Sequence, residues 1–180
     1  MSKPSTNQKK WIESGYALFG DIGTMALNVE KLSTIMGLKR SSFYHYFGTV
    51  DQYEEALLEH HVARYQKIGE IIRDYTEFDQ LFSREVFEHQ DALMFQRQLM
   101  INQSVERYKH CSDKARLHTE PKTFELWSVF TNKEEASEED WEMFRVVRDF
   151  YFVNHGQSNL AHDPKEVITK LHSYWNRTKK

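Results

Sequence analysis

The chain has 180 residues and a formal net charge of −3, and hydrophobic residues make up 39% of it. This apolar content is enough for a packed core, so the composition excludes wholesale disorder. Only 3 Pro and 7 Gly occur, which favours helices over a turn-rich β architecture. The single cysteine, Cys111, excludes a disulfide within the chain and fits a reducing compartment.

The N-terminus is polar and lacks the apolar segment of a signal peptide. No run approaches the roughly 20 apolar residues that are needed to cross a bilayer. We therefore expect a cytoplasmic protein with no membrane partner. Charge is unevenly distributed, because residues 1–50 carry a net +3 and residues 51–180 carry −6. This modest asymmetry agrees with a basic, DNA-binding N-terminal part but does not establish one.

Helical periodicity begins near the N-terminus, where apolar residues predict a helix over residues 8–19. Asn28 is a predicted N-cap for a second, short helix, and Gly37 stands where a left-handed residue commonly ends a helix. A third helix is expected to start near Lys39. Phe43 and Phe47 are four residues apart, so they point to one side of this helix and are expected to be core.

The remainder of the chain is also predicted to be helical. Gly48 ends the third helix, and Thr49 with Gln52 forms a capping-box signature for a helix over residues 50–74, with a break near Gly69. Ser137 and Asp140 mark another helix start in the same way. Further helices are expected over residues 78–89, 91–102, 104–117, 122–132, 138–155 and 165–177. The fold class is therefore all-α, with a three-helix head over residues 1–50 and a second helical domain over residues 51–180.

The segment from Asn28 to Tyr46 has the pattern of a helix-turn-helix. A recognition helix must be slim and polar to enter the major groove, and its first residues must reach base edges and phosphates. The third predicted helix has these properties on the side opposite Phe43. An ordinary pair of surface helices is an equally good interpretation of the composition alone. The candidate DNA-contacting residues are Asn28, Lys39, Arg40, Ser41, Ser42, Tyr44, His45 and Thr49.

The stretch from Ala17 to Leu57 resembles the DNA-binding domain of TetR/AcrR-type transcriptional regulators. Val50 departs from the family pattern, which usually has a phosphate-contacting Lys there, and Ser33 replaces a usual Ala. Acidic residues in the following helix are expected to lower non-specific DNA affinity; these are Asp51, Glu54, Glu55 and Glu59. The matching residues are Phe19, Gly23, Val29, Leu32, Gly37 and Leu57, together with the run Ser42-Phe43-Tyr44-His45-Tyr46-Phe47, which corresponds to the family's Thr-Leu-Tyr-x-x-Phe run.

This resemblance implies an all-helical regulator whose C-terminal domain binds a small-molecule effector and forms a homodimer through its last two helices. The predicted helix over residues 138–155 is apolar on more than one side, as a helix buried in its own subunit and against a partner would be. Burial all round within one subunit is the alternative. The sequence does not specify the effector or its binding residues. The expected dimer contacts are Trp141, Phe144, Tyr151, Leu171, Tyr174 and Trp175.

The expected function is therefore that of a ligand-responsive repressor that binds a pseudo-palindromic, double-stranded DNA operator as a homodimer. A helical protein-binding or adaptor domain that does not bind DNA is the alternative. We expect no enzyme activity, because the chain has no phosphate-binding loop, nucleophile elbow or zinc-protease motif. Cys111, His110 and His118 lack a tight ligand spacing, so no metal and no cofactor are expected.

Overall fold

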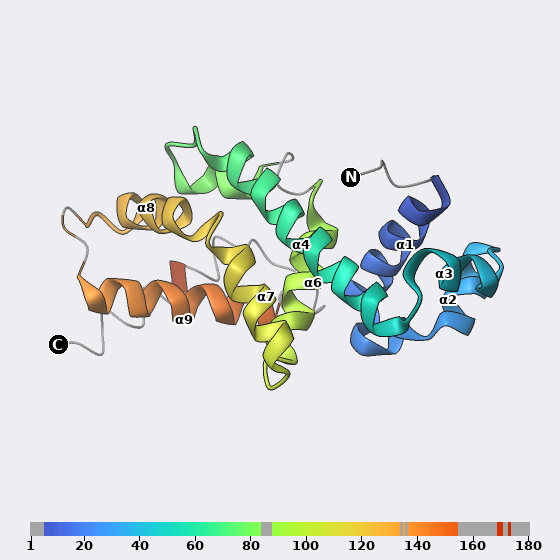
Figure 1. The fold of residues 1–180 in the computed structure, drawn as a ribbon. Helices are drawn as coiled ribbons and strands as arrows, with labels where there is room; N and C mark the ends of the chain where they lie inside the picture. The colour runs from blue at the N-terminus through green and yellow to red at the C-terminus, as the bar shows by residue number, and fades with distance from the viewer. Residues whose placement is uncertain are drawn as a thin grey trace.

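The structure is a computed structural model that describes residues 6–83, 88–133, 135, 137–154, 169, 170 and 173. Within these ranges the chain forms helices and no strand, which confirms the all-α class. The molecule is elongated, with α2 and α3 at one end and α8 and α9 at the other (Figure 1). The elements are α1 (Thr6–Ile22), η1 (Gly23–Leu27), α2 (Val29–Met36), α3 (Arg40–Phe47), α4 (Val50–Ile72), η2 (Phe78–Phe82), α6 (Gln90–Ile101), α7 (Glu106–Arg116), α8 (Glu120–Phe130) and α9 (Glu138–Asn154).

The predicted helix starts are confirmed where a polar side chain satisfies a free backbone N–H. Thr49 Oγ1 accepts a hydrogen bond of 3.1 Å from the backbone N–H of Gln52 at the start of α4. Before α9, the backbone N–H of Asp140 donates to Ser137 Oγ at 3.3 Å, and Asp140 Oδ2 accepts from the backbone N–H of Ser137 at 3.0 Å. The Ser137 hydroxyl also donates to Asp140 Oδ2 at 2.6 Å. This bond, together with that from the Ser137 backbone N–H and the nearby Lys133, lowers the pKa of Asp140 to about 2.

Two predicted elements differ from the observed ones. The α4 helix runs through Gly69 without the expected break, because a glycine costs a helix only about 1 kcal/mol and the neighbouring Ile68 and Ile72 are buried. The predicted helix over residues 78–89 begins as a short 3-10 helix, η2, and residues 84–87 lie outside the described residues. The predicted C-terminal helix over residues 165–177 lies outside them as well, apart from residues 169, 170 and 173, which are helical.

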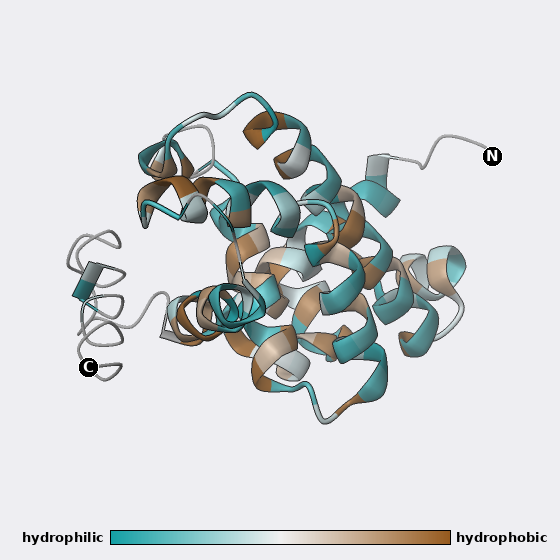
Figure 2. Ribbon diagram, turned by 90° about the vertical axis from the view of Figure 1, so that its left-hand side faces the viewer, coloured by the Kyte–Doolittle hydropathy of each residue, from teal (hydrophilic) through white to brown (hydrophobic). Residues whose placement is uncertain are grey.

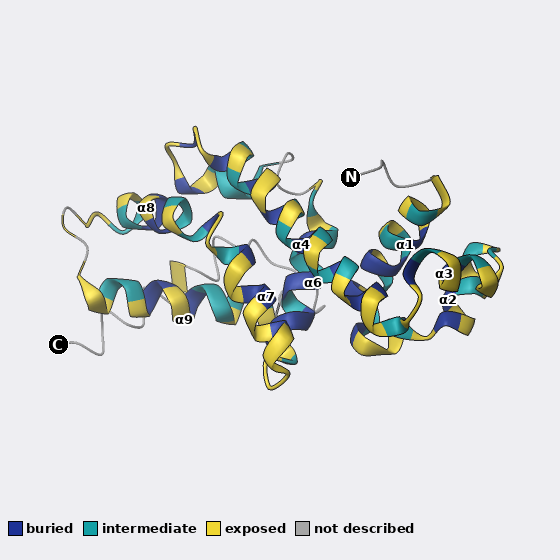
Figure 3. Cartoon of the chain, viewed as in Figure 1, coloured by how far each residue is buried: buried dark blue, intermediate teal, exposed yellow. Residues whose placement is uncertain are grey.

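The buried core runs continuously from α1 to α9. Apolar segments face one another where the helices meet (Figure 2). Buried residues recur along α4 and α6, in the middle of the molecule (Figure 3). The α1 helix packs extensively on α6, where Tyr16 and Phe19 both stack on Phe95 with ring centroids 4.4 Å apart. The α1 helix therefore connects the predicted head to the predicted C-terminal domain.

A chain of buried hydrogen bonds ties these helices together. The Tyr16 hydroxyl bonds His61 Nδ1 at 2.7 Å, His61 Nε2 bonds Gln96 Oε1 at 2.9 Å, and the Gln96 amide donates to Ser112 Oγ at 2.7 Å. Burial lowers the pKa of His61 to about 3, although its bond to Gln96 acts in the opposite direction. The imidazole is therefore neutral at physiological pH and links α1, α4, α6 and α7 as a hydrogen-bonded structural group.

Candidate nucleic-acid interface

The α2 and α3 helices are joined by a three-residue turn from Gly37 to Lys39. Asn28 caps α2, because its side-chain oxygen accepts a hydrogen bond of 3.0 Å from the backbone N–H of Lys31. Gly37 ends α2 in the left-handed region with φ of 63°, as predicted, and Leu38 N–H then bonds Ser33 O at 3.1 Å. Glycine adopts this conformation without the steric cost that a side chain brings, so it allows the abrupt change of direction into α3.

The inner side of α3 is fixed by aromatic packing. Phe43 is fully buried and Phe47 is 7% exposed, which confirms that both are core residues. The Phe43 ring contacts Trp11 of α1 edge-on at 5.3 Å and Tyr53 of α4 at 4.9 Å, and Tyr53 also contacts Phe47 at 4.8 Å. Buried aromatic pairs of this kind combine a large apolar area with a defined ring geometry. They hold α3 in one orientation relative to α1 and α4.

The outer side of α3 is exposed and polar. Lys39, Arg40, Ser41, Tyr44 and His45 are all exposed, so the structure brings five of the eight candidate residues together on or beside one helix face. The surfaces of α2 and α3 that face away from α1 and α4 are largely accessible (Figure 3). Arg40 forms an ion pair of 3.3 Å with Glu30 of α2, and both side chains are largely exposed.

The other three candidate residues have local structural roles. The Ser42 hydroxyl donates to Lys39 O at 2.7 Å and accepts from Trp11 Nε1 at 3.3 Å. Ser42 is half-buried and fixes the start of α3 against α1 through these two bonds; its contact with DNA stays a prediction. Asn28 and Thr49 cap α2 and α4 but remain exposed, and their amide N–H and hydroxyl groups can still donate.

Fewer acidic side chains of α4 are exposed beside α3 than the sequence predicted. Glu54 of α4 is 2% exposed; its carboxylate accepts from the Tyr108 hydroxyl and forms a 2.6 Å ion pair with Arg107. Burial and the bond to Glu54 raise the pKa of Tyr108, which therefore remains a donor. Glu54 thus joins α4 to α7 and does not face a polyanion, whereas Asp51, Glu55 and Glu59 are exposed.

The predicted dimer contacts in α9 lie mainly on its inner side. Phe144 is 4% exposed and packs on Phe124 and Trp127 at 5.4 and 6.1 Å, so it belongs to the interior of the subunit, and its place in a dimer seam stays a prediction. Trp141 is half-buried and stacks on Phe124 at 3.6 Å, and Tyr151 is half-buried as well. Leu171, Tyr174 and Trp175 lie outside the described residues.

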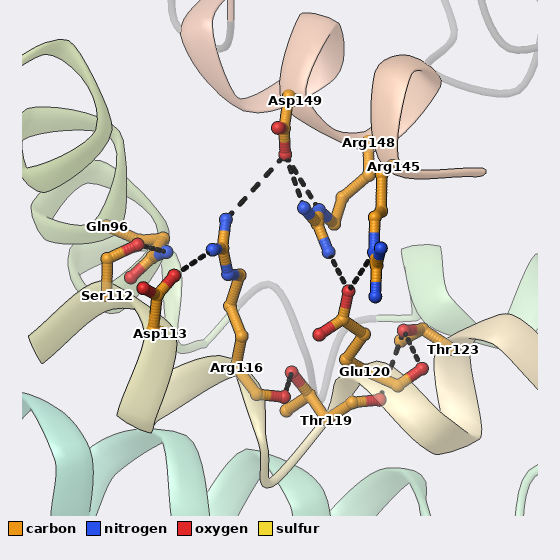
Figure 4. A network of polar contacts seen from close by, with 10 residues as sticks. All are labelled: Gln96, Ser112, Asp113, Arg116, Thr119, Glu120, Thr123, Arg145, Arg148 and Asp149. Atoms are coloured by element: carbon orange, nitrogen blue, oxygen red, sulfur yellow. Dashed lines mark hydrogen bonds and ion pairs between the residues drawn. The ribbon is translucent and has the colours of Figure 1, made fainter. Parts of the chain in front are cut away.

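An apolar cavity of about 140 Å³ lies between α4, η2, α6, α7, α8 and α9. Its polar wall belongs to a network of three guanidinium groups and three carboxylates, from Arg116, Arg145, Arg148, Asp113, Glu120 and Asp149 (Figure 4). The sequence alone did not predict this network. The spacing of Asp113 and Arg116 on α7 could have predicted one ion pair of the network, because residues three apart are neighbours on a helix surface.

Other site types are less well supported. The Cys111 thiol is buried and donates to Leu58 O at 3.4 Å, and burial raises its pKa to about 12, so the reactive thiolate form is suppressed. In the described ranges, His, Cys, Asp and Glu side chains form no group of three that could hold a metal ion. None of the helices described by the structure is both long and apolar enough to cross a membrane.

Comparison of the chain with protein-family models, with curated proteins and with solved structures finds no match. The function of the α1–α4 region is therefore inferred from the sequence and the contacts of this chain alone.

Tyr44 provides a specific test of the exposed face of α3. Its side chain is 51% exposed and its ring rests edge-on against Phe43 at 5.3 Å. We predict that Tyr44→Phe weakens binding to any DNA duplex several-fold, since one neutral hydrogen bond contributes about 0.5–1.5 kcal/mol. Tyr75→Phe, three residues beyond the C-terminal end of α4, is the control and should leave DNA affinity unchanged. A lower melting temperature of Tyr44→Phe with normal DNA affinity would instead assign the hydroxyl to the fold.

Proposed function

We propose that the chain is a ligand-responsive transcriptional regulator of the TetR/AcrR type, a repressor that binds a pseudo-palindromic operator as a homodimer. The observation that carries this proposal is the α2-turn-α3 unit, whose second helix is anchored by Phe43 and presents Lys39, Arg40 and Tyr44 to solvent. This is the arrangement that a helix-turn-helix needs in order to place its recognition helix in the major groove. The resemblance of residues 17–57 to the family's DNA-binding domain supports the same function.

The charges on this surface are compatible with DNA binding. The ion pair between Arg40 and Glu30 is exposed, and exposed pairs contribute only about 0–1 kcal/mol. A phosphate can therefore replace Glu30 as the partner of Arg40 at little cost. Lys39 supplies a second cation at the start of α3. Because the chain as a whole is acidic, we expect these local contacts to supply most of the electrostatic attraction to DNA.

A homodimer is proposed because two-fold symmetric readers bind paired half-sites. Apolar residues on the outer side of α9 support this proposal: Val146, Phe150 and Val153 are 63, 40 and 38% exposed. They recur at positions i, i+4 and i+7 and therefore follow one helix face. We propose that the dimer seam includes these residues.

Selection of bound duplexes from a random DNA library tests the proposed function. The protein should enrich two related half-sites in inverted orientation, about one helical turn or a multiple of it apart. Enrichment of a single half-site would contradict the dimer but not DNA binding. If no motif is enriched, even at low salt, the DNA-binding function is wrong and an adaptor function becomes the better hypothesis.

A further inference from the structure

The cavity between α4 and α9 is lined by two residues, Tyr65 and Arg116, that each have one buried polar atom without a hydrogen-bond partner among the residues that the structure describes. Tyr65 is 2% exposed and lines the cavity, and its hydroxyl has no hydrogen-bond partner among the residues that the structure describes. Arg116 lines the same cavity, and its buried Nε likewise lacks a partner within the described part of the chain. Buried donors are nearly always paired in folded proteins, so these two groups require an explanation.

Tyr65 Oη and Arg116 Nε are both hydrogen-bond donors and need the same kind of partner. Burial raises the pKa of Tyr65, and the positive charges of Arg116 and Arg148 oppose this rise. The phenol therefore remains protonated and can donate, with both guanidinium groups near enough to influence it. Arg116 Nη2 donates to Asp113 and Nη1 lies 3.9 Å from Asp149, so each terminal nitrogen has a carboxylate nearby, whereas Nε–H has no acceptor among the described residues. Both groups need an acceptor oxygen.

The rest of the cavity wall is apolar, so it favours a ligand that is mostly apolar. Its volume of about 140 Å³ is close to that of a cavity that accommodates one benzene ring, about 150 Å³. The wall is built mainly from buried aliphatic and aromatic side chains, which include Ile68, Ile72, Phe78, Trp127 and Val147. The cavity therefore has room for one ring or a short alkyl chain.

The guanidinium donors at the polar wall favour a carboxylate over a neutral acceptor. Arg148 and Arg116 both line the cavity, and a hydrogen bond from a guanidinium to an ionised acceptor is about twice as strong as a neutral one. Glu120 also lines the cavity, but its carboxylate is already paired with Arg148 and, at 3.5 Å, with Arg145. The three guanidinium groups and three carboxylates of the network balance in charge, so the preference for a carboxylate rests on the hydrogen bond from Arg116 Nε and not on excess positive charge.

We propose that this cavity is a binding site for a small apolar monocarboxylate, such as an aromatic acid with one ring, whose oxygens accept from Tyr65 Oη and Arg116 Nε. This inference gives the effector of the proposed regulator a chemical class. It depends on the proposed function only for the role of the ligand in regulation. The site itself is tested without DNA, so failure of ligand binding and failure of DNA binding are separate results.

The test compares three probes of similar shape by titration calorimetry on the full chain: benzoate, its neutral isostere benzamide, and toluene, which has no acceptor. Benzoate should bind most tightly, at least tenfold more tightly than toluene. Tyr65→Phe should weaken benzoate binding by roughly tenfold, the value of one charge-assisted hydrogen bond, and leave toluene binding unchanged. Tyr53→Phe removes a buried hydroxyl outside the cavity, which bonds Trp11 O at 2.8 Å, and should not change the affinity for benzoate.

Two further measurements keep the outcome unambiguous. The melting temperature of Tyr65→Phe should not fall, because the hydroxyl has no partner among the described residues; this separates a lost ligand contact from a damaged fold. Arg116→Lys keeps the charge but lacks Nε–H, and it should also weaken benzoate binding. Equal binding of benzoate and toluene, absence of benzoate binding, or equal loss of both ligands in Tyr65→Phe would overturn the proposal. Benzamide binding as tightly as benzoate would overturn the assignment of a carboxylate.

Discussion

Replacement of Phe43 by alanine is expected to unfold the α1–α3 region and to abolish DNA binding. Phe43 is fully buried, and its ring contacts Trp11, Phe47 and Tyr53 at 4.9–5.3 Å. Truncation of a core Phe to Ala costs about 3–5 kcal/mol, which is a large part of a total stability of about 5–15 kcal/mol. Circular dichroism should show reduced helicity and a melting temperature lower by on the order of 10 °C.

The adjacent residue provides the control for this prediction. Tyr44 is 51% exposed, so Tyr44→Ala should weaken DNA binding while changing the melting temperature only slightly. Phe43→Leu keeps most of the buried volume and should retain both folding and DNA binding at reduced stability. Full helicity and an unshifted melting temperature of Phe43→Ala would show that the packing of α3 is not as described.

Gly15→Ala is the second substitution with a large expected effect, because α1 and α4 approach closely at this position. A Cβ on residue 15 would lie 1.6 Å from Tyr53 Oη and 2.7 Å from Tyr53 Cζ. The Tyr53 ring would have to move and its hydroxyl would lose the 2.8 Å hydrogen bond to Trp11 O. Overpacking costs about 1–3 kcal/mol and an unmade buried hydrogen bond another ~1–3 kcal/mol, against a gain of about 1 kcal/mol in helix propensity.

A double-mutant cycle identifies the cause of this loss. Tyr53→Phe removes the atom nearest to the new Cβ, so Gly15→Ala should cost less in the Tyr53→Phe background than in the parent chain. Lys10→Ala, at an exposed position of the same helix, should change the free energy of unfolding by less than about 0.5 kcal/mol. If the costs of Gly15→Ala and Tyr53→Phe simply add, the Tyr53 hydroxyl is not the obstacle.

The local elements were predictable because their signals lie within a few residues of one another. The cap at Asn28, the left-handed Gly37 and the pair Phe43 and Phe47 each depend on local backbone geometry or helical spacing. The internal bond of Ser42 was not predictable, because the local spacing does not reveal Trp11, which is 31 residues earlier in the chain and donates to the Ser42 hydroxyl. Sequence reasoning reaches such long-range partners only after the packing of α1 on α3 is known.

The interior of the C-terminal part was less predictable for the same reason. The sequence showed that α9 is apolar on more than one side, but not which side faces inward. Phe144 is buried and Val146 is exposed, and this difference depends on where α8 packs. The cavity depends in the same way on Tyr65 of α4 and Arg116 of α7, which are far apart in sequence and meet only in the folded chain.

If the exposed face of α3 binds DNA, as we propose, the affinity must depend on salt through the cations of that face. Fluorescence anisotropy with a selected duplex should compare the parent chain, Lys39→Ala/Arg40→Ala, and the control Lys109→Ala/Lys114→Ala, whose exposed cations lie on α7. Each lost phosphate contact lowers the slope of log Kd against log salt by about 0.9. The account predicts a slope lower by about 1–2 and a weaker affinity for the α3 variant alone. Affinity and slope equal to those of the parent chain in that variant would contradict it.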